Sequence, residues 1–173
     1  MRRADFTYEL PPELIAQHPL ATRSASRLLC LDGADGGLAD RRFADLPDLL
    51  HAGDLLVIND TRVVPARLLG AKDSGGKVEM LLERVEGPRE ALCQLRTSKP
   101  ARAGAILNLE GGLAAEVVGR AGSFYRLRFD QDLMPVLEAH GHMPLPPYIR
   151  RQDEAEDRDR YQTVYAGGAD VAG

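Results

Sequence analysis

The sequence predicts a mixed α/β protein in which an α/β domain is interrupted by an inserted, small antiparallel β-barrel. Two observations lead to this prediction. A continuous apolar run of strand length, Asp54–Ile58, follows helix signals in the first sixty residues, and such runs are typical of strands buried on both faces. Six short strand-like stretches then follow between residues 65 and 129, a pattern typical of small β-barrels. We therefore expect residues 1–64 and 130–173 to form a partial α/β domain, and residues 65–129 to form the barrel.

Local signals place three elements before the apolar run. The first is a helix over residues 11–17, because it begins at two prolines, which a first helical turn tolerates, and continues with helix formers. The second is a short apolar strand over residues 27–31, which ends in a turn rich in Gly and Asp. The third is a helix over residues 46–51, with an aspartate as its cap and a glycine after its end.

The expected barrel strands are short, and turn-like or glycine-bearing segments separate most of them. They cover residues 67–70, 77–85, 91–96, 106–109, 114–118 and 124–129. The last strand alternates cleanly, with Tyr125, Leu127 and Phe129 on one face and Arg126 and Arg128 on the other. This alternation indicates a sheet with one buried face.

Helix signals return after the barrel. With Asp132 as cap, a helix covers residues 133–140, and a glycine ends it. Residues 142–149 hold three prolines and cannot be helical, because each proline forces extended geometry on the residue before it. Residues 150–160 are charge-dense, with opposite charges at the i,i+4 spacing of a solvated helix face. Residues 161–165 are expected to form a last strand.

Composition excludes several classes of protein. With 44% hydrophobic and 28% charged residues, the chain is neither disordered nor fibrous. No apolar run approaches the ~18 residues of a membrane span, and no signal peptide is visible, so we expect a soluble, cytoplasmic protein without a membrane partner. Cys30 and Cys93 lie far apart in apolar stretches without metal-ligand spacing, so we expect buried free thiols and no metal site.

The formal net charge of -4 hides a basic stretch. Between Arg89 and Arg128 there are seven Lys and Arg residues against three Glu residues. This local excess of positive charge favours a phosphate-rich partner. A solvated sheet face is the other interpretation of the same stretch, and the sequence leaves both open.

Residue chemistry alone indicates one candidate site, at residues 59–62 (Asn-Asp-Thr-Arg). These polar residues directly follow the apolar run, and ligands bind at the carboxyl ends of strands in open α/β sheets. A carboxylate beside an arginine can hold a polar ligand or act as an acid or base. It can equally form a structural turn with an ion pair. We expect residues 142–149 and 161–165 to approach this cluster.

Five blocks of the sequence, taken together and in order, resemble a known family. They are Asp-Phe with Glu-Leu-Pro within 5–11, Gly-Asp-Leu-Leu-Val-Ile-Asn-Asp-Thr-Arg-Val-Val-Pro-Ala-Arg-Leu at 53–68, Gly-Gly-Lys-Val-Glu at 75–79, Gly-His-Met-Pro-Leu-Pro-Pro-Tyr-Ile at 141–149 and Tyr-Gln-Thr-Val-Tyr at 161–165. The chain resembles the S-adenosylmethionine:tRNA ribosyltransferase-isomerases of queuosine biosynthesis. The resemblance extends from residue 5 to about residue 168.

The resemblance implies a reaction and its partners. The ribosyl part of S-adenosylmethionine is transferred to 7-aminomethyl-7-deazaguanine at the wobble position of the tRNA anticodon. It is isomerised to an epoxycyclopentane ring, which gives epoxyqueuosine with release of adenine and methionine. S-adenosylmethionine is then a co-substrate, the tRNA anticodon stem-loop is the partner, and neither a prosthetic group nor a metal is implied. The family fold, an α/β domain interrupted by a small barrel, agrees with the expected one.

Combined with residue chemistry, the resemblance also implies roles. Asp60 is a catalytic candidate for charge or proton work near the sulfonium. Arg62 is a catalytic candidate that orients Asp60 or the methionine carboxylate. The other candidates would bind substrate by stacking or hydrogen bonding: Asn59, Thr61, Tyr148, Arg150, Tyr161, Gln162 and Thr163.

One departure from the family pattern concerns the end of the chain. In the family, the last block is followed by Gly-Ala-Val-Ala-Ala-Pro-Thr-Ala-Gly-Leu-His-Phe and a long α/β remainder, whereas residues 168–173 match this segment only in part. We therefore expect an apparently truncated, N-terminal portion that is inactive by itself and self-associates through an open sheet edge. The alternative is a non-catalytic RNA-binding or scaffold fragment built around the barrel.

Overall fold

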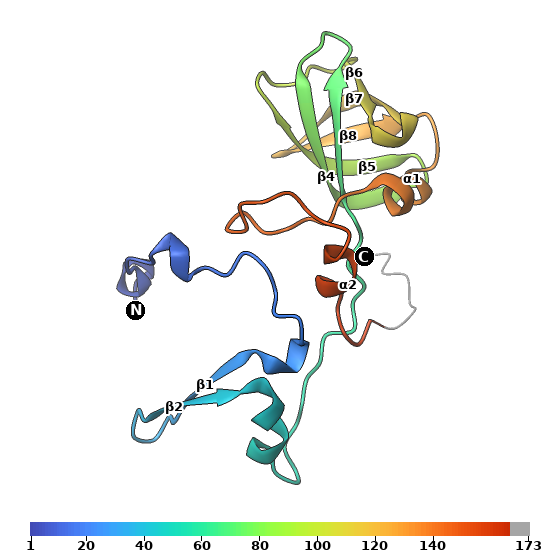
Figure 1. The fold of residues 1–173 in the computed structure, drawn as a ribbon. Coiled ribbons are helices and arrows are strands. Elements are labelled where there is room, and N and C mark those ends of the chain that lie inside the picture. The colour runs from blue at the N-terminus through green and yellow to red at the C-terminus, as the bar shows by residue number, and fades with distance from the viewer. Residues whose placement is uncertain (167–173) are drawn as a thin grey trace. The chain divides into compact units, whose positions relative to one another are not determined.

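The computed structural model describes residues 1–166 and divides the chain into two compact units (Figure 1). One unit begins at Asn59 and holds the barrel, together with the segments that run up to Pro146 and onward from Gln152. The other unit consists of Met1–Ile58 and Pro147–Arg151. The sequence features noted at residues 168–173 lie outside the described residues. No helix of the described part is long and apolar enough to cross a membrane.

Six antiparallel strands close into a barrel in the order β3-β4-β5-β8-β7-β6 (Figure 1). Their bounds are β3 Arg67–Lys72, β4 Lys77–Gly87, β5 Glu90–Thr97, β6 Ile106–Leu109, β7 Ala114–Ala121 and β8 Phe124–Phe129. All six expected strands are thereby confirmed: β6 and β8 have the expected bounds, and the other four are longer by two or three residues. The barrel closes because β3 pairs with β6 on one side and with β4 on the other.

The barrel core follows the alternation of side chains along each strand. In β8, Tyr125, Leu127 and Phe129 are buried while Arg126 and Arg128 are exposed, which confirms the expected faces. The buried thiol of Cys93 belongs to this core, and burial raises its pKa to about 12. Cys93 is therefore a small core residue at neutral pH rather than a nucleophile. Cys30, in the other unit, is free and half-buried.

Helix α1 (Leu133–His140) belongs to the same core. Leu133, Val136 and Leu137 are buried among the barrel side chains. The helix begins and ends as predicted, but the reason for the final glycine differs from the expected one. Gly141 has a φ of -67°, so it is not a left-handed cap. A Cβ there would lie 2.0 Å from the carbonyl oxygen of Pro65, so glycine is required by close packing.

The barrel unit is larger than the segment 65–129 that the sequence indicated. Residues 59–64, 130–146 and 152–166 belong to it. The cause is the packing of α1 into the core, together with hydrogen bonds that tie later segments to the start of the barrel. One of these is an isolated bridge between Arg67 and His142, in the extended segment after α1.

The unit formed by residues 1–58 and 147–151 contains little regular structure. It has η1 (Arg3–Phe6), η2 (Pro12–Leu14), η3 (Arg23–Ala25) and η4 (Phe43–Leu49), all 3-10 helices, and a two-stranded antiparallel sheet of β1 (Arg27–Leu31) and β2 (Leu38–Arg42). The strand expected at 27–31 is confirmed. The helices expected at 11–17 and 46–51 are replaced by the shorter 3-10 helices η2 and η4, each of which contains a proline.

The strand predicted at Asp54–Ile58 is wrong for this structure. These residues are in no strand, and the side chains of Leu55 and Val57 are 89% and 83% exposed. An apolar run predicts burial, but a strand also needs hydrogen-bonding neighbours, and no described segment pairs with this one.

The strand predicted at Tyr161–Tyr165 is also absent. The charged helix expected over 150–160 is reduced to α2 (Asp157–Arg160), and the chain continues from it in turns. Tyr161 donates its N–H to the carbonyl of Asp157, and Ala166 donates to that of Thr163. Backbone groups of this segment are thus satisfied locally rather than in a sheet ladder.

Candidate functional site

The candidate cluster 59–62 folds into a local turn. Asn59 Oδ1 accepts hydrogen bonds from the backbone N–H of Thr61, at 3.0 Å, and from Thr61 Oγ1, at 2.6 Å. An asparagine that binds the backbone two residues onward is a common way to fix a turn. Asn59 and Thr61 therefore shape this segment, and both are exposed.

Gln162 joins this segment to the last sequence block. Its Oε1 accepts from the N–H of Val63 at 2.7 Å, and its Nε2 donates to the carbonyl of Val63 at 3.1 Å. The same Oε1 also accepts from the N–H of Thr163 at 3.1 Å. Two blocks that are almost 100 residues apart in sequence are therefore held together, as predicted, although through one side chain rather than through paired strands.

A cavity of about 780 Å³ lies directly beside this junction. Its volume is large enough for a small-molecule ligand. It is enclosed by the chain before β3, the middle of β4 and the outer side of α1. Its lining residues are 62–66, 82–85, Met134, Pro135, Glu138 and Pro144. Valines, prolines, a leucine and a methionine make most of this lining apolar, and charged side chains add polar groups. This combination suits a ligand that has both an apolar and a charged part.

Arg62 is the predicted site residue that lines this cavity. Its Nη2 lies 3.6 Å from Oε1 of Glu138 on α1, and both side chains are about half exposed. An ion pair so exposed is weak, so the guanidinium can exchange this partner for a ligand carboxylate. Within residues 1–166, no salt bridge joins Arg62 to Asp60, and the exposed Asp60 is not among the lining residues.

Tyr148 and Arg150 belong to the other compact unit. There Gln17 holds their loop: its Nε2 donates to the carbonyl of Tyr148 at 3.1 Å, and its Oε1 accepts from the N–H of Arg150 at 2.6 Å. Arg151 Nε donates to the carbonyl of Gln17 at 2.8 Å. Tyr148 and Arg150 line a cavity of about 490 Å³, which His18 also lines. Both predicted side chains thus sit in a cavity with a partly cationic lining.

Two of the predicted binding residues stay at the periphery. Tyr161 is exposed and lines neither of these cavities, and Thr163 contributes a backbone N–H to Gln162. Among residues 1–166, no cluster of three or more His, Cys, Asp and Glu side chains could hold a metal ion.

Sequence reasoning missed a histidine held between two carboxylates. His142 Nδ1 lies 2.9 Å from Oδ1 of Asp153, and its Nε2 lies 3.1 Å from Oε2 of Glu110. Partial burial lowers the pKa of His142, but its hydrogen bonds and charge interactions with Glu110 and Asp153 together raise it above the ordinary value. The Gly-His block marked the histidine, but no local pattern connects it with a glutamate 32 residues earlier.

The two carboxylates also bind backbone groups. Glu110 Oε2 accepts from the N–H of Leu69 at 2.9 Å, and Asp153 Oδ2 accepts from that of Met143 at 3.0 Å. His142 thereby fastens the proline-rich segment to β3 and to the turn after β6. Because Asp153 and Glu110 bind the two ring nitrogens of His142, this cluster has a structural role: it holds the chain segments in position.

Comparison with known proteins matches this chain to a protein family and to solved structures. A family model described as "Queuosine biosynthesis protein" matches residues 3–172. Among solved structures, an S-adenosylmethionine tRNA ribosyltransferase from Thermotoga maritima is 35% identical in sequence, with a TM-score of 0.41. The match covers 80% of this chain and 48% of that protein, so the chain spans about half the length of this relative.

Proposed function

The chain belongs to the queuosine biosynthesis protein family, and from this premise we propose that it acts in S-adenosylmethionine-dependent ribosyl transfer and isomerisation on tRNA. The acceptor would be 7-aminomethyl-7-deazaguanine at the wobble position, and the products would be epoxyqueuosine, adenine and methionine. The observation that carries this proposal is the family match over residues 3–172. The identity of 35% with an S-adenosylmethionine tRNA ribosyltransferase supports it.

The reaction requires three events. A base removes a proton from the carbon next to the sulfonium, adenine leaves the ribose, and the amine of the deazaguanine attacks. S-adenosylmethionine is consumed, so its ribosyl carbons end in the product and no prosthetic group is needed. A carboxylate near the sulfonium would stabilise the substrate cation and could accept the proton, and we assign this role to Asp60.

We assign the methionine end of the co-substrate to the cavity beside Arg62. The apolar lining accommodates the methylene carbons of methionine, while Arg62 can bind the carboxylate in bidentate fashion. Glu138, now 3.6 Å from Arg62, is then free to bind the methionine ammonium. Asn59, Thr61, Gln162 and Thr163 hold the adjoining segment in place. We further propose that Tyr148 and Arg150 contact the RNA, because a base that is modified must leave its stack and tyrosine offers a stacking surface.

Isothermal titration of the chain with two ligands tests this proposal. We expect binding of S-adenosylmethionine and of an unmodified tRNA anticodon stem-loop. Arg62→Gln should weaken binding of S-adenosylmethionine and leave RNA binding unchanged. Binding of RNA without S-adenosylmethionine would contradict the proposal and favour a non-catalytic RNA-binding module. Release of adenine from S-adenosylmethionine, measured with tRNA that bears the deazaguanine, reports the reaction directly.

A further inference from the structure

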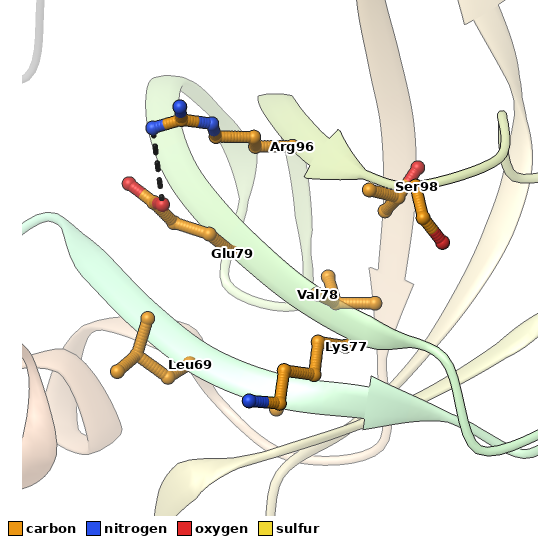
Figure 2. A pocket seen from close by; sticks show the side chains of 8 residues that line it. Leu69, Lys77, Val78, Glu79, Arg96 and Ser98 are labelled. Carbon is orange, nitrogen blue, oxygen red and sulfur yellow. Dashed lines mark ion pairs between the residues drawn. The ribbon is translucent and has the colours of Figure 1, made fainter.

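A groove of about 640 Å³ runs along the outer surface of β3, β4 and β5, on the same unit as the cavity of Arg62 but lined by different residues (Figure 2). Its charged lining consists of Lys77, Glu79 and Arg96, and Thr97 and Ser98 supply hydroxyl groups. The strands turn their apolar side chains inward here: Val78 and Met80 are buried, whereas Lys77 and Arg96 are exposed.

Strand register arranges these charges in neighbouring rows. Leu69 pairs with Glu79, and Glu79 pairs with Arg96, so the three side chains form one row across the sheet. Lys77 precedes Glu79 by two residues, so it lies on the same face in the next row. The carboxylate of Glu79 forms ion pairs with two guanidinium groups, with Arg67 Nε at 3.4 Å and with Arg96 Nη1 at 3.9 Å. The groove therefore carries an excess of positive charge.

The loop after β5, which contains Lys99, continues from the end of the groove. The ammonium of Lys72 donates to the carbonyl of Lys99, and Thr97 Oγ1 donates to the same carbonyl at 2.7 Å. These bonds fasten the loop to the β3–β4 turn, which is where Lys77 begins its strand. Within residues 1–166, Lys77 and Lys99 form no salt bridge.

The cations of the basic stretch between Arg89 and Arg128 fall into two groups, according to whether a carboxylate or an aromatic ring partners them closely. Several of its arginines are neutralised: Arg126 lies 2.7 Å from Glu86, Arg128 lies 3.1 Å from Glu90, and Arg89 lies 2.8 Å from Asp132. Arg120 stacks over the ring of Tyr125, 4.1 Å from its centroid. Arg96 differs from these arginines because it shares its partner Glu79 with Arg67, so a net positive charge remains in the part of the stretch that borders the groove.

We propose that this groove binds the phosphate backbone of RNA, and the proposal takes the RNA to be the tRNA of the proposed function. Lysine and arginine side chains bind phosphates, and a hydroxyl group such as that of Ser98 can donate a further hydrogen bond. Among residues 1–166, no aromatic side chain lines the groove, so the described lining offers no platform on which single-stranded bases could stack. It therefore positions the RNA without reading its sequence, and its contribution depends on salt.

The test compares the binding of tRNA to two variants that lose equal charge. Lys77→Gln with Arg96→Gln removes two cations of the groove, of which Arg96 only shares Glu79 with Arg67. Arg126→Gln with Arg128→Gln removes two cations elsewhere on the barrel that lie close to Glu86 and Glu90. At about 0.1 M salt, we expect the groove variant to bind tRNA on the order of 10- to 60-fold more weakly, with a logarithmic salt slope smaller by about 1.5 to 2. The control variant should bind within about threefold of the unchanged protein, because each of its cations lies within hydrogen-bonding distance of a carboxylate of its own.

Further measurements fix the meaning of each outcome. Lys77→Arg with Arg96→Lys keeps both charges and should restore binding, and melting temperatures check that each variant folds. Equal weakening in both double variants would overturn the proposal, as would binding of anionic lipid vesicles in place of tRNA. Failure of the proposed function would appear differently, as a lack of S-adenosylmethionine binding while tRNA binding stays sensitive to the groove variant. If S-adenosylmethionine binds and the groove variant binds tRNA as tightly as the unchanged protein, only the groove proposal is rejected and the proposed function stands.

Discussion

The side-chain amide of Gln162 binds both backbone groups of Val63, accepting from its N–H at 2.7 Å and donating to its carbonyl at 3.1 Å. A neighbouring strand would make the same two bonds, so Gln162 takes the place of a strand at this point. Val63 lines the 780 Å³ cavity. Its neighbour in the chain, Arg62, is the residue proposed to bind the ligand carboxylate there. The position of Arg62 therefore depends on a glutamine almost 100 residues later.

Removal of this amide should destabilise the barrel unit. Gln162→Ala leaves two half-buried backbone groups without partners, and we expect a loss of about 1–3 kcal/mol. Gln162→Glu should lose less, because a carboxylate still accepts from the N–H of Val63 but cannot donate to its carbonyl. Urea unfolding measures both effects. Gln94→Ala is the control, since its exposed bond to Glu83 should contribute less than about 0.5 kcal/mol; an equal loss in Gln94→Ala would contradict the interpretation.

Barrel closure should depend on Gly70. It pairs with Leu109 where β3 meets β6, and a Cβ there would lie 2.2 Å from the carbonyl oxygen of Asn108. Gly70→Ala must push the two strands apart, so we expect a loss of about 2 kcal/mol or more. Gly119→Ala is the matched control on β7, because nothing lies within 4 Å of its Cβ position. Thermal melts should separate the two variants by several degrees, and similar melting temperatures would show that the closure tolerates a methyl group.

Stability should depend on pH through His142. Its pKa is raised in the folded protein by Glu110 and Asp153, which outweigh the opposing effect of burial. The protonated form is thus favoured by folding: the contribution is complete below the ordinary value of 6.5 and is lost as pH rises through the folded-state pKa. His142→Gln should therefore lower the melting temperature more at pH 5.5 than at pH 8.5.

His140→Gln supplies the control for this pH dependence. His140 lies two residues away on α1 and is exposed, so its replacement should have little effect on the melting temperature. A loss for His142→Gln that is independent of pH would mean that packing, rather than charge, accounts for the role of His142.

The barrel could be predicted from the sequence because its information is local. Strands such as Phe124–Phe129 alternate between apolar and charged residues, and glycine-bearing turns separate them. Helix α1 was equally predictable, since Asp132 and Gly141 mark its ends. The apolar run Asp54–Ile58 was misleading because hydrophobicity indicates that a segment favours burial, but not whether a partner is present to bury it.

The candidate site was predictable only in part. We expected residues 161–165 to approach residues 59–62, and Gln162 does join the last block to Val63, directly after that cluster. The counter-ion of Arg62 was not predictable, because Glu138 is supplied by the packing of α1. The pairing of His142 with Glu110 likewise depends on tertiary structure. Such long-range contacts leave no trace in local spacing.

Asp60 should affect the binding of charged co-substrate specifically. Asp60→Asn removes a charge and keeps the shape, so we expect S-adenosylmethionine to bind about tenfold more weakly, which corresponds to about 1.4 kcal/mol. S-adenosylhomocysteine, which lacks the sulfonium charge, should bind both forms equally. If Asp60 acts as a general acid or base, Asp60→Asn should lower turnover by about 10²–10⁴-fold. Equal weakening of both ligands, or a lower melting temperature, would assign Asp60 to the turn instead.

The two compact units should differ in their resistance to proteolysis. No residue of segment 1–58 is buried, whereas the barrel unit contains every fully buried side chain of the described part. The regular sheet of the first unit is a single pair of strands, β1 and β2, which is marginal in water by itself. We expect chymotrypsin to cut first within segment 1–58, at exposed residues such as Phe43 and Leu55, and to leave a resistant fragment that begins near Asn59. Mass spectrometry of the early products identifies the cuts; first cuts within 67–129 would contradict this order.

The same burial pattern predicts self-association through the apolar run. Leu55, Leu56, Val57 and Ile58 are all more than half exposed, and contiguous exposed apolar surface favours association. Size-exclusion chromatography should therefore show a mass that increases with protein concentration. Leu55→Glu with Val57→Glu places two like charges in the run and should give a monomer, while Leu29→Glu with Leu31→Glu on β1 is the control at another exposed apolar site. A monomer at every concentration would show that the run stays solvated. Association that only the control pair abolishes would instead assign the contact to β1.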